Sequence, residues 1–214
     1  MRAQGITASC SLLWERGATA LIGISPFNSY FDEDRIRRLM QFCGRDGREV
    51  LLFVPDEVTR YTLEAKGYAQ DRAARKTSRQ LQYLGNKIAR AADGSPPAIL
   101  GCAQLAERVA YLRRHAELQQ RFETDAAFRL ACLETTRWVL AASPEEEVEE
   151  GAALLGVRYL LAELPMFLHA TEVTGRNEVV FVYHQCPQLV ADLYAGRYGD
   201  VVSPGQGFVE VTDG

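Results

Sequence analysis

The sequence predicts an α/β fold in which a parallel sheet is flanked by helices, within one domain spanning residues 1–214. Short apolar runs typical of buried strands alternate along the chain with longer stretches of helical periodicity. Two of these runs are separated by a single helical stretch, and that order predicts parallel strands joined by a right-handed crossover. With 214 residues, of which 47% are hydrophobic and 24% charged, the chain is long enough to bury a sizeable core.

Three strands are expected. The first is the run ATALIGIS (18–25), which is followed by a helix over residues 32–42 with Ile36 and Leu39 on one face. The run EVLLFVP (49–55) is the second strand, and NEVVFVYHQ (177–185), rich in β-branched and aromatic residues, is the third. A short helix is expected over residues 186–196. The tail from residue 197 is expected to be irregular and partly disordered.

The region between the second and third strands is mostly helical. A long helix is predicted from about residue 71 to about residue 92, ended by the glycines and prolines of ADGSPPAILG (92–101). Two or three helices follow in residues 102–142, and another contains RYLLAELPMFL (158–168).

Charge, cysteine usage and missing motifs exclude several classes of protein. The net charge is −4 and the pI about 5.5, so any nucleic-acid binding must come from a local patch. The five cysteines are scattered without a C-x-x-C pair, and we expect no disulfide and no metal. Neither G-x-x-x-x-G-K-[ST] nor G-x-G-x-x-G occurs, so we expect no nucleotide cofactor. No signal-peptide core is visible and no segment approaches the roughly 18 apolar residues of a membrane span, so we expect a cytoplasmic protein without membrane contact.

Polar residues follow all three predicted strands, with Asp56 after the second. Ser25 and Asn28 follow the first strand, and Tyr183 and His184 end the third. Because ligands of open α/β sheets bind at the carboxyl ends of parallel strands, these side chains are candidates for one site. Ser25 could act there as a nucleophile, although serine and asparagine at such positions also serve as turn residues.

The helical run 158–168 carries a second candidate. Tyr159 and Glu163 are four residues apart and share one helical face, among apolar neighbours that predict a core location. A buried carboxylate there could bind an ammonium group or, with a raised pKa, move protons. The spacing alone is equally compatible with a partly exposed helical residue, and Pro165 is expected to break or kink the helix just after it.

The long helix from about residue 71 carries a stripe of basic residues. At about 100° per residue, its six cations project within roughly 60° of one direction and extend over about 27 Å. Such a stripe suits contact with a nucleic-acid backbone, and RNA is favoured because no groove-reading motif is present. A solvated basic face is the alternative. The six residues are Arg72, Arg75, Lys76, Arg79, Lys87 and Arg90.

Together these features resemble the cyclodipeptide synthases, which make a cyclic dipeptide from two aminoacyl-tRNAs. The resemblance covers nearly the whole chain and implies a Rossmann-like domain similar to the catalytic domain of class I tyrosyl- and tryptophanyl-tRNA synthetases. It implies aminoacyl-tRNAs as substrates and the basic helix as the site that grips the first tRNA. The matching residues are Gly23, Ser25 and Asn28 (G-x-S-x-x-N), Tyr159, Glu163 and Pro165 (Y-x-x-x-E-x-P), and Tyr183.

The resemblance further implies a ping-pong mechanism. Ser25 would attack the ester of the first aminoacyl-tRNA and hold its aminoacyl group. The second aminoacyl-tRNA would supply an amine that attacks this acyl-enzyme, and the resulting dipeptidyl-enzyme would cyclise. Tyr159 and Glu163 would hold the ammonium of the first substrate, while Asn28 and Tyr183 would position its backbone.

One position departs from the family. The residue after Tyr183 is commonly glutamine or proline there, and here it is His184, a catalytic-site candidate whose role stays open. Tyr111 matches a further site tyrosine only approximately. Strand and helix phase suggest apolar walls for the pocket of the first amino acid, and we expect a monomer. The predicted walls are Gly23, Val54, Met166 and Phe181.

Two other functions remain as alternatives. A serine hydrolase or esterase would need a histidine beside Ser25, and GISPF (23–27) lacks the second glycine of the G-x-S-x-G elbow. A non-catalytic RNA-binding module would use the basic helix and leave Ser25 dispensable.

Overall fold

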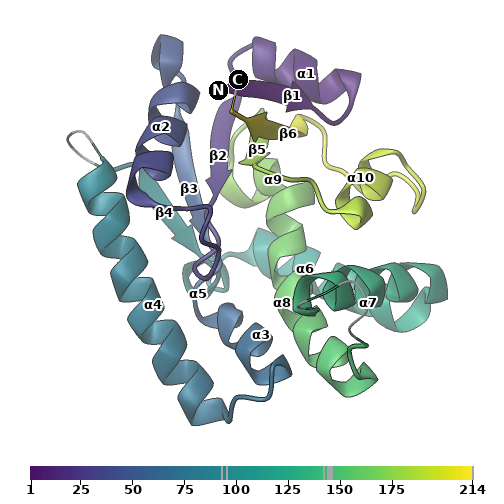
Figure 1. Cartoon of the computed structure of the whole chain (residues 1–214). Coiled ribbons are helices and arrows are strands. Elements are labelled where there is room, and N and C mark those ends of the chain that lie inside the picture. Colours follow the sequence, from purple (N-terminus) through teal and green to yellow (C-terminus); the bar gives the residue numbers. More distant parts are fainter. Residues whose placement is uncertain (93, 95, 142, 144–146, 214) are drawn as a thin grey trace.

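The structure, a computed structural model, contains one six-stranded sheet in the order β1-β6-β5-β2-β3-β4 (Figure 1). It describes residues 1–92, 94, 96–141, 143 and 147–213. Strands β2 to β6 pair in parallel, and β1 pairs antiparallel with β6. This arrangement confirms the predicted α/β fold. The strands are β1 (Arg2–Gly5), β2 (Thr19–Gly23), β3 (Val50–Val54), β4 (Ala98–Gly101), β5 (Val179–Tyr183) and β6 (Gln206–Thr212).

The helices lie between the strands along the chain, as the sequence predicts. The long basic helix, α4, is close to its predicted bounds. The helices are α1 (Ala8–Glu15), α2 (Glu33–Cys43), α3 (Arg60–Ala65), α4 (Gln70–Ala91), α5 (Cys102–Leu105), α6 (Val109–Thr124), α7 (Ala126–Leu140), α8 (Glu150–Leu168), α9 (Ala170–Thr174) and α10 (Gln188–Tyr194), with 3-10 turns at Arg45–Gly47 and Glu57–Thr59.

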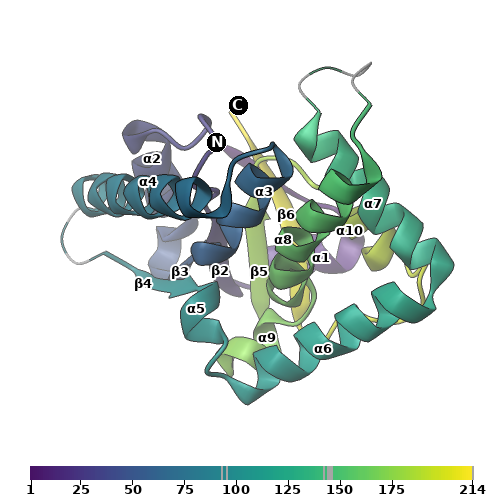
Figure 2. The same ribbon diagram turned by 90° about the horizontal axis from the view of Figure 1, so that it is seen from below.

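Helices cover both faces of the sheet (Figure 2), and an apolar cluster lies on each face. On one face, Ile36 of α2 and Ile88 of α4 belong to the same cluster as Ile22 of β2. On the other face, α6, α7 and α8 pack over Leu21 and Phe53. Successive residues of a strand point to opposite faces, which is why Leu21 and Ile22 enter different clusters. The alternation places Ser25 on the same face of the sheet as Leu21 and Gly23, toward α8.

Helix α8 is a core helix. Within the described residues it is the one helix long and apolar enough to cross a membrane by composition, but 61% of its most apolar window is buried inside the protein. The expectation that no segment approaches such a length is therefore wrong, and the burial of α8 identifies it as a core helix. The helix also continues through Pro165 to Leu168, so the proline does not end it.

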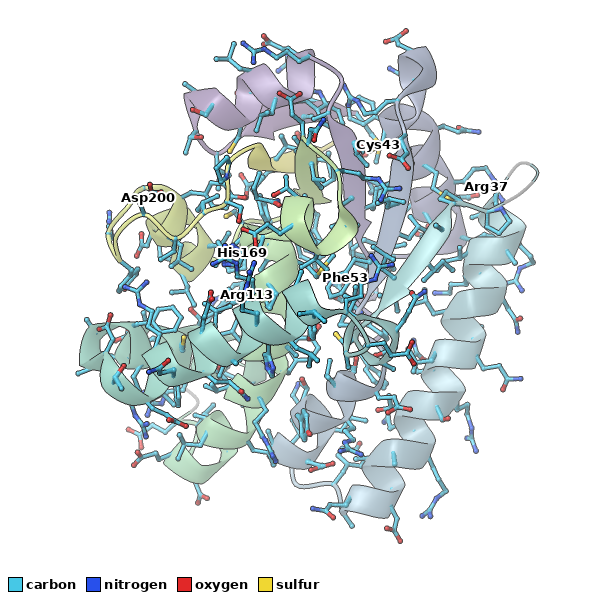
Figure 3. The ribbon with its side chains drawn as sticks, turned by 180° about the vertical axis from the view of Figure 1, so that it is seen from behind. Arg37, Cys43, Phe53, Arg113, His169 and Asp200 are labelled. Carbon is cyan, nitrogen blue, oxygen red and sulfur yellow. The ribbon has the colours of Figure 1, made fainter. Side chains whose placement is uncertain are left out.

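The expectation of an irregular tail is correct for residues 197–205, which form turns and bends, and wrong for residues 206–212, which form a strand. Residues 206–212 form β6, in which Phe208 is fully buried. The segment before β6 is held by a hydrogen-bond network that begins at His169, which is labelled in Figure 3. His169 Nδ1 lies 2.8 Å from Ser203 Oγ, and this hydroxyl donates to Glu172 (2.6 Å). Gly205 has a φ of +74°, so the stretch SPGQG forms a real turn, and its loop-like composition hides the strand that follows.

Other elements, among them β1, β4, α1 and α9 (Ala170–Thr174), were not predicted from the sequence. Strands β1 and β4 have only four residues each and lie at the two edges of the sheet, and α1 connects β1 to β2. Such short segments carry too few residues to show a period.

Candidate active site

The loop after β2 begins where the sheet approaches α8. β2 and β3 pair with Gly23 opposite Phe53, and Gly23 also lies against β5. A side chain at Gly23 would place its Cβ 2.6 Å from the Phe181 ring and 3.2 Å from the Tyr183 ring, so this close approach requires glycine. The two aromatic rings and the glycine therefore share the face of the sheet that Ser25 continues.

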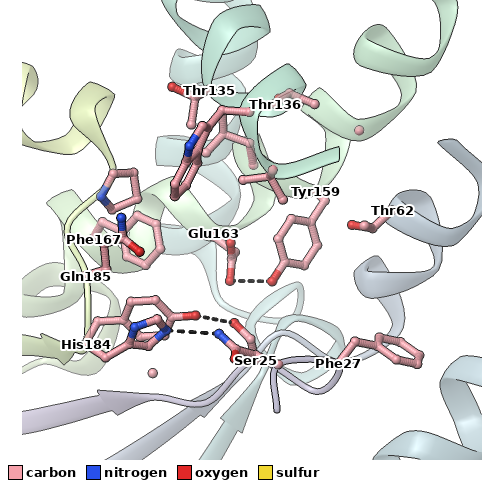
Figure 4. A pocket seen from close by; sticks show the side chains of 18 of the residues that line it. Ser25, Phe27, Thr62, Thr135, Thr136, Tyr159, Glu163, Phe167, His184 and Gln185 are labelled. Carbon is pink, nitrogen blue, oxygen red and sulfur yellow. Dashed lines mark hydrogen bonds between the residues drawn. The ribbon is translucent and has the colours of Figure 1, made fainter. Parts of the chain in front are cut away.

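Ser25 and Tyr183 meet above this face. Ser25 Oγ lies 2.8 Å from the phenolic oxygen of Tyr183, and the two residues are 158 positions apart in sequence (Figure 4). Burial raises the pKa of Tyr183 to about 12, so its phenol stays protonated at neutral pH. Tyr183 can therefore hold the serine oxygen in place but cannot act as its base.

Tyr159 and Glu163 lie on the α8 side of the same cavity. The Tyr159 hydroxyl donates a 2.9 Å hydrogen bond to Glu163 Oε1. Burial raises the pKa of Glu163 to about 8, although the hydrogen bond from Tyr159 opposes the shift. A carboxyl with such a pKa can exchange a proton with an α-amino group, whose ordinary pKa is also close to 8 (about 7.7–8.0).

Asn28 and His184 form a third pair at the strand ends. Asn28 Nδ2 lies 3.0 Å from His184 Nε2, and the Asn28 side-chain oxygen accepts a hydrogen bond from the Tyr30 backbone N–H (2.9 Å). This pair joins the loop that carries Ser25 to the end of β5. The structure thus brings together all six predicted catalytic-site residues, which are Ser25, Asn28, Tyr159, Glu163, Tyr183 and His184.

These residues line a cavity of about 510 Å³, with Gly23 and Phe181 among its walls. Val54 and Met166, predicted as further walls, do not line it. The register that pairs Gly23 with Phe53 places Phe53 on the cavity face and Val54 on the opposite face. The cavity wall on β3 is therefore Phe53, one residue before the predicted Val54.

On α8 the cavity wall follows the helical repeat. Phe167, four residues after Glu163, lines the cavity, whereas Met166 is fully buried beside it. Helix α7 also contributes Thr136 and the exposed Trp138, which the sequence analysis did not identify. No motif marks α7 as part of a site, so only the packing of α7 on α8 reveals them.

The basic stripe on α4 divides into two parts. Arg72, Arg75, Lys76 and Arg79 are exposed on the outer face. The other two cations contact the loop and helix that follow Ser25: Lys87 Nζ donates to the Phe31 carbonyl oxygen (3.1 Å), and Arg90 pairs with Glu33 (2.7 Å). Gln80, between the two parts, donates to the carbonyl oxygen of Pro26.

No histidine among the described residues is hydrogen-bonded to Ser25 Oγ. His184 is paired with Asn28, His169 with Ser203, and His115 stacks on Tyr111 with ring centroids 5.8 Å apart. Tyr111 itself is buried and donates to the Ala162 carbonyl oxygen outside the cavity lining. The serine-histidine pair that a hydrolase needs is not formed. In the described part of the chain, no three His, Cys, Asp or Glu side chains are placed to hold a metal ion.

The fold is that of the catalytic domain of class I tRNA synthetases, and Ser25 shares one cavity with the Tyr159–Glu163 pair. The chain superposes on the tyrosyl-tRNA synthetase of Archaeoglobus fulgidus with a TM-score of 0.58 at 11% identity, covering 97% of this chain and 59% of that one, which supports the Rossmann-like fold. A solved cyclodipeptide synthetase from Mycobacterium tuberculosis superposes with a TM-score of 0.88 at 26% identity, covering 99% and 93% of the two chains.

The cyclodipeptide synthase family model matches residues 1–213, and the chain belongs to this family. It is 29% identical over 220 residues to the cyclo(L-leucyl-L-leucyl) synthase of Bacillus subtilis, covering 99% of this chain and 89% of that protein. It is also 29% identical over 219 residues to the cyclo(L-leucyl-L-phenylalanyl) synthase of Streptomyces noursei, covering 99% and 91%. The protein is therefore an enzyme that makes cyclodipeptides, and its family implies aminoacyl-tRNA substrates.

Proposed function

We propose that the enzyme joins two aminoacyl groups through an aminoacyl ester on Ser25. The observation that carries this proposal is the placement of Ser25 Oγ, held by Tyr183, in the same cavity as the Tyr159–Glu163 pair. Ser25 can accept the aminoacyl group while the Tyr159–Glu163 pair binds its amine. The aminoacyl-tRNA ester is already activated, so no ATP site is required.

The first step is a transesterification. The Ser25 oxygen attacks the carbonyl carbon of the aminoacyl ester, the bond from that carbon to the terminal ribose oxygen of the tRNA breaks, and the serine proton ends on that ribose hydroxyl. Binding the substrate's ammonium at Glu163 fixes the ester near Ser25, and such orientation can supply a large share of the rate enhancement.

The second step requires a change from the sequence-based mechanism. If the amine of the second substrate attacked the seryl ester, Ser25 would be released and the dipeptide would remain on the tRNA. A dipeptidyl-enzyme forms only if the amine of aminoacyl-Ser25 attacks the ester of the second aminoacyl-tRNA. The new terminal amine then attacks the seryl ester, closes the ring and frees Ser25.

Glu163 supports the second step as a proton acceptor. The attacking amine must lose its extra proton, and a carboxyl with a pKa of about 8 can take it in the cavity. The same group can return a proton to the departing ribose oxygen.

We also propose that the first amino acid is apolar. The cavity wall beside Ser25 includes the rings of Phe53, Phe167 and Phe181, and the names of the two relatives contain leucine and phenylalanine. The six site residues meet in one cavity without a contribution from a second copy, and we propose that the enzyme acts as a monomer. We place it in the cytoplasm, where aminoacyl-tRNAs are made.

The exposed cations of α4 are proposed to bind the backbone of the first tRNA. Replacing Arg75 and Arg79 together by glutamine is expected to weaken tRNA binding and to reduce the dependence of log K on log salt concentration by about 1.5, because two phosphate contacts are lost. Binding of aminoacyl-tRNA is measured over a salt series. The matched control replaces the exposed residues Arg2, in the edge strand β1, and Arg16, at the end of α1, by glutamine. An equal change in the control would contradict a specific role for α4.

Trapping of the acyl-enzyme tests the proposed function. The protein is mixed with one radiolabelled aminoacyl-tRNA, quenched with acid and analysed by intact mass and peptide mapping. We expect the aminoacyl group on the peptide that contains Ser25. Product formation without any protein-bound aminoacyl group would overturn the covalent mechanism.

A further inference from the structure

His184 lies in a layered stack of side chains beside the loop that carries Ser25. Its ring lies against that of Tyr30, with centroids 4.2 Å apart and planes 27° apart. The guanidinium of Arg35 lies 4.6 Å from the centroid of the Tyr30 ring, and the ring centroids of Tyr183 and His184 are 4.5 Å apart. The imidazole is therefore enclosed by aromatic rings on either side of its hydrogen bond to Asn28.

The Asn28 amide determines which nitrogen of His184 carries the proton. The Asn28 oxygen accepts from the Tyr30 backbone N–H, so its orientation is set, and its NH₂ group faces His184 Nε2. An amide NH₂ is only a donor, so Nε2 must be an acceptor without a proton. His184 is then neutral, with its single proton on Nδ1.

We propose that His184 is a positioning residue that holds the Ser25 loop in its reactive geometry only while the imidazole is neutral, so that acidification slows acylation of Ser25. This inference rests on the proposed function, because its readout is the aminoacyl ester on Ser25.

Protonation would place an N–H on Nε2 directly against the Asn28 NH₂ group. Two donors cannot share a hydrogen bond, so the Asn28 side chain would have to turn and release the Tyr30 N–H. Asn28 lies three residues after Ser25, and its backbone N–H donates to the Ser25 carbonyl oxygen (3.2 Å). His184 also follows Tyr183, the hydrogen-bond partner of Ser25. Disruption of the Asn28–His184 pair would therefore affect residues next to both partners of the Ser25–Tyr183 hydrogen bond.

The charged groups around His184 favour its neutral form. Burial lowers the pKa of His184 below its ordinary value of 6.5, and Arg35 of α2 lowers it further, while Glu210 of β6 opposes the shift. Arg35 is itself paired with Asp213. The phenols of Tyr30 and Tyr183 have raised pKa values and stay neutral. The loss of acylation is thus expected on the acid side of 6.5.

The test compares single-turnover acylation of Ser25 in the wild type and in H184Q from about pH 5.5 to about pH 8. Acylation requires no free amine, so deprotonation of a second substrate does not enter. The side-chain oxygen of glutamine can accept from Asn28 and does not titrate. Because Glu163 titrates equally in both proteins, the rate ratio of wild type to H184Q isolates His184.

We expect this ratio to be constant above about pH 7. Below the pKa of His184 it should decrease with falling pH, with a slope that approaches ten-fold per pH unit. A ratio that stays constant over the whole range would overturn the inference. H115Q, which changes a half-buried histidine outside the cavity, is the matched control and should leave the ratio of wild type to variant constant. A failure to acylate at any pH would overturn the proposed function and this inference together.

A second measurement needs only the wild-type chain, which has three histidines. Imidazole nitrogen chemical shifts in ¹⁵N-labelled protein at neutral pH are expected to show His184 with its proton on Nδ1. A proton on Nε2 would contradict the hydrogen bond from Asn28 and overturn the inference even if H184Q does not fold.

Discussion

Replacing Ser25 by alanine is expected to lower the rate of cyclodipeptide formation by about three orders of magnitude or more. Alanine removes the oxygen that accepts the aminoacyl group, so the first ester cannot be moved from the tRNA to the protein. The half-exposed loop position tolerates the smaller side chain, so folding is preserved. The product is measured by mass spectrometry of culture medium and by initial rates with purified protein.

Tyr183→Phe is the matched control for this loss. It removes the hydroxyl that lies 2.8 Å from Ser25 Oγ but keeps the nucleophile. We expect a rate between those of wild type and Ser25→Ala, with the aminoacyl ester still detectable. Retained product in Ser25→Ala would show that Ser25 is a turn residue rather than the acyl acceptor.

The two alternative functions are not supported. A hydrolase would release the amino acid from aminoacyl-tRNA, yet Ser25 has a phenol and no histidine as its hydrogen-bond partner. An RNA-binding module would leave the cavity unused. Both conflict with membership of the cyclodipeptide synthase family over residues 1–213.

The sequence predicts the residues of the site better than their contacts. A strand that ends in Ser25 and a helix that carries Tyr159 and Glu163 on one face are local patterns, so they can be recognised without a structure. The contact of Ser25 with Tyr183 joins residues 158 positions apart and depends on β2 and β5 being neighbours. The order of the strands in the sheet cannot be deduced from the sequence of either segment alone.

The errors have the same physical origin. The prediction that Val54 faces the cavity is wrong because the residue opposite Gly23 depends on strand register. A slip of one residue moves every side chain of a strand to the other face of the sheet. Trp138 was missed because α7 is near the cavity only through its packing on α8. The pairing of Asn28 with His184 likewise required the sheet to be assembled first.

The second large effect is expected for Glu163→Gln, which should lower kcat/KM for cyclodipeptide formation about 100-fold or more. Glutamine keeps the size of the side chain and can still accept the hydrogen bond from Tyr159, but it can neither pair with an ammonium nor take a proton. The change therefore removes the proton chemistry and leaves the packing of α8.

The pH dependence distinguishes this loss from a structural one. In the free wild-type enzyme Glu163 has a pKa of about 8, so its carboxylate becomes populated as the pH rises through that value. The substrate's ammonium is lost over about the same range (about 7.7–8.0), so kcat/KM should pass through a maximum near pH 8. In Glu163→Gln there is neither a carboxylate to populate nor an ammonium pair to lose, so the maximum near pH 8 should be absent. Initial rates are corrected for spontaneous hydrolysis of the aminoacyl ester.

Tyr159→Phe provides the opposite test of the same group. The hydrogen bond from Tyr159 lowers the pKa of Glu163, so removing it should raise that pKa and move the acid limb to higher pH. The carboxyl is still present, so the maximum is kept. Glu163 as proton acceptor therefore requires three different profiles: a maximum in the wild type, a displaced maximum in Tyr159→Phe and none in Glu163→Gln. A maximum that persists unchanged in Glu163→Gln would assign the proton transfer to another group.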